Sequence, residues 1–300
     1  MITRTYSSPA AFKQALEQRL RSAAESGAGF ARKRQVLVFE RFLARIAIAL
    51  GKTATLKGGL VLEIRLQRAR TTKDVDLRLM GSSDDVLATL QEAGRRDLGD
   101  FMTFEIGPDE DHPEIQNDAL QYDGLRFRAE CKLAGKIYGQ PFGVDVAFGD
   151  PIMGEPEVVV ADDLLAFAGI APPAIQLYPL ESHIAEKLHA YTMPRNRPNS
   201  RVKDLPDLAL LATVRQIEGA KLRDAIELTF KHRATHAVPE SFPDPPSSWE
   251  IIYEKIAAND SLQWRTLVEV TEAVKIFLDP VLAGTTARWE IHPWEWRNLR

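Results

Sequence analysis

The sequence KGGLVLEIRLQRARTTKDVDLRL, residues 57–79, combines a glycine turn, an amphipathic helical segment and a strand with two aspartates. The segment DVDLRL alternates apolar and polar residues, as a half-buried strand does. Side chains at positions i and i+2 of a strand point to the same face, so Asp74 and Asp76 should project together, roughly 7 Å apart. Two ionised carboxylates at that spacing repel each other unless a positive group lies between them. The pattern therefore raises the hypothesis of a bound metal ion.

The composition limits the class of protein. The chain has 300 residues, of which 45% are hydrophobic and 27% charged, enough to bury the core of one large or two modest domains. A formal net charge of -4 gives no global basic field, so any nucleic-acid contact must come from local patches. The single cysteine, Cys131, excludes an intrachain disulfide and fits a reducing compartment. The apolar run at residues 45–50 is too short to span a bilayer, and the first residues lack a signal-peptide pattern. We therefore expect a cytoplasmic protein without a membrane segment.

Apolar periodicity divides the chain into two parts. Residues 1–160 should form an α/β domain, with helices near 8–27, 31–50 and 83–96 and strands in FMTFEIG, LRFRAECKLAG and FGVDVAFGD. This order predicts a mixed or antiparallel sheet with flanking helices rather than a repeated βαβ series. Residues 161–300 should form a helical domain that begins with ADDLLAFAG at 161–169. The proline-rich segment 238–248 reads as a linker.

Two further features of the first part point to phosphate chemistry. Asp145 lies in the strand-like GVDVAFG, a third strand aspartate. Hard cations such as Mg²⁺ prefer oxygen ligands, and two such ions could promote an in-line phosphoryl transfer. Gly58 and Gly59 precede a helix start, whose backbone N–H groups form a natural phosphate cradle.

Three motifs in order carry a family resemblance: KGG with R-x-T-x-D-V-D-L, then EKLHAYT, then RVKDLPDL. Together they resemble the DNA polymerase β-like nucleotidyltransferase superfamily, and within it the AbiEii-type and MenT-type toxins, over about residues 35–215. The resemblance implies a nucleotidyltransferase core with a helical C-terminal lobe. It also implies transfer of a nucleoside monophosphate from an NTP to the 3′ end of tRNA, with pyrophosphate release and a block of translation. The implied cofactor is Mg²⁺ or Mn²⁺, and the implied partners are tRNA, NTP and a cognate antitoxin protein.

The resemblance also implies roles for particular residues. The catalytic residues would be Asp74, Asp76, Lys187 and Asp204. Asp74, Asp76 and Asp145 would be the metal ligands, Asp145 by strand context alone. The nucleotide would be bound by Lys57, Gly58, Gly59, Arg70 and Thr72. Leu60 stands where such enzymes commonly have Ser or Thr, so the hydroxyl contact to a terminal phosphate is missing there.

The helical part supplies further candidates, each with an ordinary structural alternative. Lys187 reads as a surface lysine or as a phosphate contact, which the resemblance favours. Asp204 reads as a helix N-cap that could also belong to the site, and Asp207 as a structural residue at position N3. The loop MPRNRPNSRVK, residues 193–203, concentrates positive charge and is the candidate RNA-binding segment. Its basic residues are Arg195, Arg197, Arg201 and Lys203.

Two alternative functions remain open from the sequence. The first is a nucleotidyltransferase that modifies a protein or a small molecule, as an adenylyltransferase does; a small acidic pocket would favour it, and a wide basic groove would favour nucleic acid. The second is a catalytically silent binding module of the same fold, in which the three acids would not converge.

Overall fold

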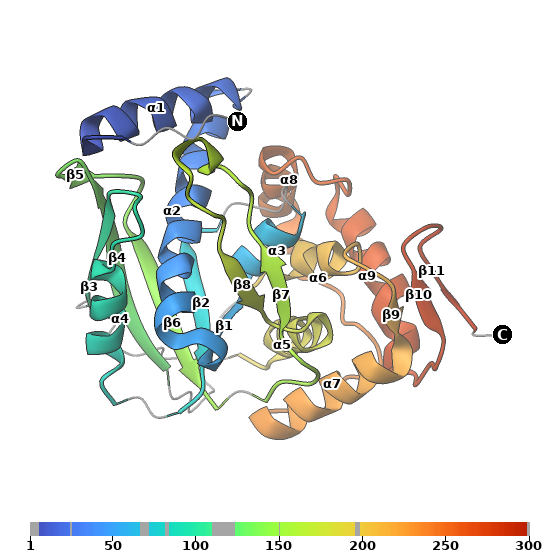
Figure 1. Cartoon of the computed structure of the whole chain (residues 1–300). Helices are drawn as coiled ribbons and strands as arrows, with labels where there is room; N and C mark the ends of the chain where they lie inside the picture. Colours follow the sequence, from blue (N-terminus) through green and yellow to red (C-terminus); the bar gives the residue numbers. More distant parts are fainter. Residues whose placement is uncertain are drawn as a thin grey trace.

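The computed structural model describes residues 6–24, 26–66, 72–81, 84–109, 124–149, 151–195 and 199–298. Within these ranges an eight-stranded sheet has the strand order β3-β4-β6-β2-β1-β8-β7, and the short β5 pairs with β4 (Figure 1). In chain order its strands are β1 (Ala54–Lys57), β2 (Asp74–Leu79), β3 (Met102–Pro108), β4 (Gly124–Leu133), β5 (Lys136–Ile137), β6 (Phe142–Phe148), β7 (Glu157–Val160) and β8 (Ala174–Leu177).

The sheet is mixed, as predicted. Strand β2 runs antiparallel to β1 and parallel to β6, and β6 runs antiparallel to β4. The register sets Lys57 opposite Asp76 across one pair of strands, and Asp76 opposite Asp145 across the next. The centre of the sheet thus gathers the charged strand residues identified from the sequence.

Four helices accompany the sheet: α1 (Pro9–Ser22), α2 (Gly27–Leu50), α3 (Gly59–Leu66) and α4 (Val86–Arg95). The predicted start of α1 is confirmed, since the Ser8 side chain accepts a hydrogen bond from the Ala11 N–H and proline follows at the first helical position. Helix α2 lies across one face of the sheet (Figure 1). Its Arg41 and Arg45 are buried and bind the buried carboxylate of Asp100 at 2.7 Å, fixing α2 to the loop before β3. Charged pairs of this kind are well compensated when both oxygens receive hydrogen bonds.

The second part of the chain is mainly helical and lies to the right in Figure 1. Its helices are α5 (Leu180–Thr192), α6 (Asp204–Leu211), α7 (Gly219–Arg233), α8 (Glu250–Asn259) and α9 (Leu267–Leu282). A small sheet of β9 (Ile217–Glu218), β10 (Arg288–Glu290) and β11 (Glu295–Arg297) closes its far side. Residues 238–246 form neither helix nor strand, in keeping with their prolines.

One predicted helix is wrong. The segment 161–169 contains only the 3₁₀ turn η2 (Ala166–Ala168), which ends at Gly169 with φ of +71°. Its buried Leu165 and Phe167 belong to the same apolar cluster as the sheet, and β8 follows shortly afterwards. That cluster extends to Leu177, and a second cluster joins the helices from Leu180 onward with Leu62 of α3. The division into domains at residue 160 stays a prediction.

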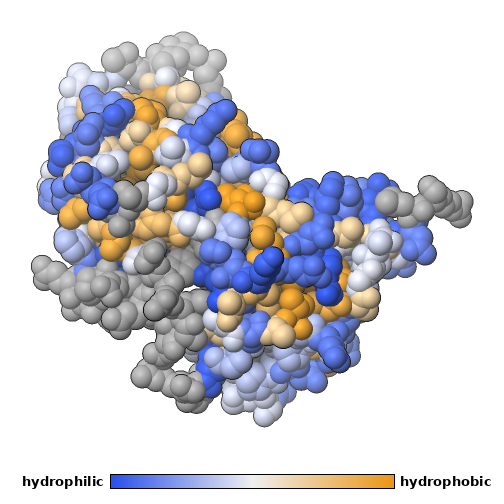
Figure 2. Space-filling model, turned by 90° about the horizontal axis from the view of Figure 1, so that it is seen from below, coloured by the Kyte–Doolittle hydropathy of each residue, from blue (hydrophilic) through white to orange (hydrophobic). Residues whose placement is uncertain are grey.

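The surface carries no extended apolar belt on the face shown in Figure 2, where apolar patches alternate with hydrophilic residues. Among the described helices, none is both long enough and apolar enough to cross a membrane.

Candidate active site

A cleft of about 520 Å³ opens where the β1–α3 turn and β2 face α5 and the segment leading into α6. It brings together residues that are more than a hundred positions apart in the sequence. The predicted residues that line it are Lys57, Gly58, Gly59, Thr72, Asp74, Asp76, Lys187, Arg195, Arg201, Lys203 and Asp204. Two other predicted residues, Arg70 and Arg197, lie outside the described residues.

Two glycines make room for the paired carboxylates. Gly58 has a φ of +71°, which L side chains rarely adopt, and a Cβ at this position would overlap the carboxylate of Asp76. A Cβ on Gly143 of β6 would come within 2.6 Å of Asp74 Oδ1, and the Gly143 backbone donates a hydrogen bond to that carboxylate. Gly58 therefore has a local reason to be glycine besides any contact with phosphate.

The negative charge of the acidic pair is only partly compensated by its neighbours. Loss of hydration raises the pKa of Asp76 to about 6; Asp145 adds to the rise, while Lys57 and Lys187 oppose it. Loss of hydration and then Asp145 also raise the pKa of Asp74, against the charge of Arg126. Carboxylates whose ionised form is disfavoured in this way gain from a cation placed between them. Asp74 and Asp76 are thus suited to hold a divalent metal ion.

The surroundings of Asp145 differ from those expected of a metal ligand in the cleft. Arg126 of β4 binds it with two parallel hydrogen bonds, Nε to Oδ1 at 2.7 Å and Nη2 to Oδ2 at 2.6 Å. The carboxylate does not line the cleft. In the part of the chain that the structure describes, no group of three or more His, Cys, Asp or Glu side chains is arranged to hold a metal ion. Of the three predicted metal ligands, the cleft therefore presents two, Asp74 and Asp76.

Lys187 of α5 is not the surface residue that its helix position suggested. Only 14% of its side chain is exposed, and its Nζ donates to Asp204 Oδ1 and Asp207 Oδ2, each at 2.8 Å. Both aspartates are buried. The predicted capping role is also wrong, because the N-cap of α6 is Lys203 and makes no side-chain capping bond. The first turn of α6 instead presents two carboxylates to Lys187, and Asp204 Oδ2 has no hydrogen-bond partner within the described ranges.

The basic residues of the segment before α6 differ in how free they are to contact a ligand in the cleft. Arg195 donates through Nη2 to the Ala190 carbonyl at 2.9 Å, close to the C-terminal end of α5, so part of its guanidinium has a structural role. Arg201 is 37% exposed and approaches Asp204 Oδ2 at 3.8 Å. Lys203 is exposed. Arg201 and Lys203 are the two described residues of this segment best placed to contact a polyanion.

Five residues of the cleft were not among the predicted site residues, and two of them, Glu186 and His183, bear on its charge. Glu186 receives hydrogen bonds from Lys57 Nζ at 3.4 Å and Tyr178 Oη at 3.1 Å, and so anchors the lysine of the glycine turn to α5. His183 is buried, and neither ring nitrogen has a hydrogen-bond partner among the residues described here. Burial and then the charge of Lys187 hold the pKa of His183 well below its usual range, so the ring is neutral. The only sequence signal was position, since Glu186 precedes Lys187 and His183 lies one helical turn before it.

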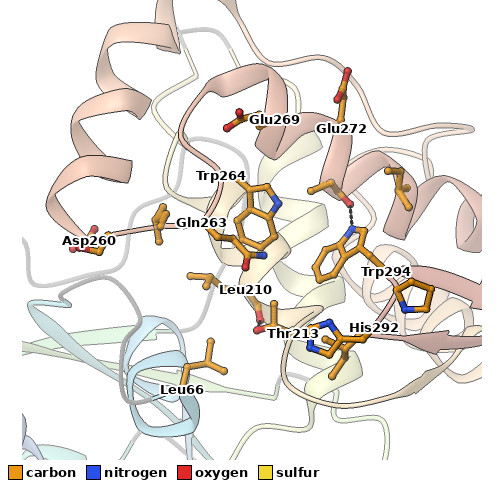
Figure 3. Close-up of a pocket in the computed structure, with 16 residues that line it drawn as sticks. Leu66, Leu210, Thr213, Asp260, Gln263, Trp264, Glu269, Glu272, His292 and Trp294 are labelled. Carbon is orange, nitrogen blue, oxygen red and sulfur yellow. Dashed lines mark hydrogen bonds between the residues drawn. The ribbon is translucent and has the colours of Figure 1, made fainter.

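A larger cavity of about 790 Å³ lies within the helical part (Figure 3). It is lined by Trp264, Trp294 and the carboxylates of Asp260, Glu269 and Glu272, with no lysine or arginine among its lining residues. A triphosphate would find no positive partner there. The Trp294 indole donates to the Ala273 carbonyl at 3.2 Å, so it belongs to the packing that holds the C-terminal hairpin.

Comparison with known families decides the family assignment. The family model described as "Nucleotidyl transferase AbiEii toxin, Type IV TA system" matches residues 41–296. The chain belongs to the AbiEii nucleotidyltransferase toxin family. As an AbiEii protein it is an NTP-using transferase, and its family places it in a type IV toxin–antitoxin system. The predicted resemblance is thereby confirmed.

A solved structure of a nucleotidyltransferase toxin agrees on the fold. MenT4, a nucleotidyltransferase toxin from Mycobacterium tuberculosis H37Rv, is 13% identical, and the match covers 94% of this AbiEii chain and 92% of MenT4 with a TM-score of 0.60. JHP933 from Helicobacter pylori is 14% identical over 83% of this chain and 90% of its own, with a TM-score of 0.46. No match was found among curated proteins.

Proposed function

We propose that this AbiEii protein transfers a nucleoside monophosphate from an NTP to the 3′ end of tRNA, releases pyrophosphate and so blocks translation. The observation that carries the proposal is the cleft, where the acidic pair, the glycine turn and the Lys187–Asp204 pair converge. An action on tRNA places the protein in the cytoplasm, and a toxin of this kind needs a cognate antitoxin.

The glycine turn and the lysines bind the triphosphate in this proposal. Gly58 and Gly59 present backbone N–H groups at the start of α3, where the helix dipole favours an anion. Lys57 and Lys187 add positive charge that acts on Asp76. A lysine is a compact point charge on a flexible stem, suited to a phosphate tail whose charge moves during the reaction.

In this proposal the acidic pair holds the metal ion that acts on the α-phosphate. Asp74 and Asp76 would hold Mg²⁺ or Mn²⁺, which supplies a positive charge that polarises the α-phosphate. The terminal hydroxyl of the acceptor attacks the α-phosphorus, the bond to the β-phosphate breaks, and pyrophosphate leaves. Asp204 would accept the hydroxyl proton; its Oδ2 is buried without a hydrogen-bond partner within the described chain and lies 3.8 Å from Arg201 Nη1.

The charge of the cleft favours a polyanionic acceptor. Its lining includes six lysine or arginine residues and four aspartate or glutamate residues. Two of the acidic residues, Glu186 and Asp204, are paired with lysines. A cationic small molecule, the acceptor of the adenylyltransferase alternative, would meet repulsion from this surface, whereas an RNA backbone would be attracted to Arg201 and Lys203.

The test is incubation of the protein with Mg²⁺, total RNA and each of the four α-³²P-labelled NTPs in turn. We expect label in the tRNA band. RNA that has been oxidised with periodate before the incubation should take up no label, because the oxidation destroys the 3′-terminal diol. Asp76→Asn is the matched inactive control. Label that appears in protein or small molecules but not in RNA would contradict the proposed acceptor.

A further inference from the structure

The strongest unassigned feature next to the cleft is the ion pair between Arg126 and Asp145. The two residues face each other directly across β4 and β6. Both carboxylate oxygens are used, at 2.7 and 2.6 Å. The Asp145 side chain is only 15% exposed and that of Arg126 34%, so water weakens the pair less than at a fully open surface. A fork-to-fork pair of this geometry is among the strongest that side chains form.

The position of the pair in the sheet matters for metal binding. Asp145 stands opposite Asp76 in the parallel register, and Asp74 stands opposite Gly143. A third carboxylate beside the acidic pair is therefore present in the chain, but the guanidinium of Arg126 already neutralises it. Arg126 also interacts electrostatically with Asp74. A second cation between Asp145 and the pair would meet the fixed positive charge of Arg126, and a like charge in a partly dehydrated site opposes its binding.

We propose that this active site takes one divalent cation, held by Asp74 and Asp76, and that Arg126 excludes a second by occupying Asp145. Arg126 is a positioning residue in this account: it sets the number of metal ions and supplies one permanent positive charge beside the acidic pair. The inference rests on the proposed nucleotidyl transfer at this cleft, but it concerns the number of ions and not the acceptor.

The test counts Mn²⁺ ions on the full chain without turnover. Equilibrium dialysis with Mn²⁺ and an α,β-methylene nucleoside triphosphate, with a protein-free dialysis to correct for Mn²⁺–nucleotide, gives the ions bound per chain. Frozen-solution electron paramagnetic resonance of the same samples separates a single ion from a spin-coupled pair a few ångströms apart. Arg126→Met keeps an unbranched, flexible side chain but removes its charge, and Arg126→Met with Asp145→Asn is the matched control.

The wild type should bind one Mn²⁺ and give an uncoupled six-line spectrum. Arg126→Met should bind two with a coupled spectrum, and the double variant should return to one. A coupled pair in the wild type would overturn the proposal, and so would a single ion in a folded Arg126→Met variant.

Asp145→Asn keeps the proposal testable if Arg126→Met does not fold. This variant should still bind one Mn²⁺, and its affinity should fall by less than about tenfold, because Asp145 is not a ligand and acts on the acidic pair only through its charge. A tenfold or greater loss would contradict the assignment. Failure of RNA labelling with a count of one ion would refute the proposed acceptor but leave this inference standing.

Discussion

Replacing Asp76 by asparagine should abolish transfer and, in the absence of metal, make the folded protein more stable. Asparagine has the same shape, so it keeps the fit against Gly58, but it removes the charge that Asp74 and Asp145 disfavour. The folded-state pKa of Asp76 is about 6, against an ordinary value of 3.8. The difference of about two pKa units corresponds to about 3 kcal/mol at 1.36 kcal/mol per unit. The carboxylate is half-buried, and solvent screening reduces the expected gain to about 1–3 kcal/mol.

The sign of the pH dependence follows from the raised pKa. The folded protein holds the proton of Asp76 more tightly than the unfolded chain does. The charge therefore costs nothing below about pH 4, begins to destabilise the fold above that pH, and has its full effect once pH exceeds about 6. The stability advantage of Asp76→Asn should grow between pH 5 and pH 8 by about 1 kcal/mol.

The assay is urea unfolding of both proteins in EDTA at pH 5 and pH 8. Asp224→Asn, at an exposed position of α7, is the control for removal of an ordinary aspartate and should change stability by less than about 0.5 kcal/mol. An Asp76→Asn protein less stable than wild type at pH 8, or an advantage that shrinks as pH rises, would refute the reasoning.

Three further predictions follow from the contacts of the cleft. Lys187→Met should lose activity. It should also lower the free energy of unfolding in urea by about 3 kcal/mol, because two buried carboxylates lose their partner. An unchanged free energy of unfolding would show that these ion pairs do not stabilise the fold. Gly58→Ala should weaken Mn²⁺ binding at least about tenfold by crowding the acidic pair, whereas Gly149→Ala, with a similar φ of +74° and open space around it, should carry only the backbone cost of about 1–2 kcal/mol. Arg201→Gln with Lys203→Gln should lower the slope of log affinity for RNA against log salt by about 1.4–1.8 and leave NTP binding unchanged; an unaltered slope would remove this segment from the RNA interface.

Much of the site could be predicted because its parts are close in sequence or belong to recognisable motifs. The glycine turn and the D-x-D strand are separated by one short helix, so their order along the chain follows from local pattern, whereas the antiparallel pairing of β1 and β2 is seen only in the structure. The motifs around Lys187 and Asp204 were located by resemblance, and the structure brings them to the same cleft.

The parts that could not be predicted depend on distant register or on competition between elements. The pairing of Arg126 with Asp145 is set by the antiparallel alignment of β4 and β6, and no local pattern identifies it. The burial of Lys187 depends on the approach of α6 to α5, which a helix pattern alone does not reveal. The segment 161–169 has apolar spacing compatible with a helix, but its apolar residues pack with the sheet instead.

The most direct test of the proposed reaction compares two positions of the ³²P label in the NTP, with the same tRNA as acceptor. Purified protein, Mg²⁺ and deacylated tRNA are incubated with the preferred NTP, labelled with ³²P at either the α or the γ position. Transfer of a nucleoside monophosphate predicts that the α label enters the 3′ end of the tRNA while the γ label appears only in pyrophosphate, and that Asp76→Asn does neither. Incorporation of the γ label into the tRNA, or release of pyrophosphate without labelled tRNA, would contradict nucleotidyl transfer to tRNA.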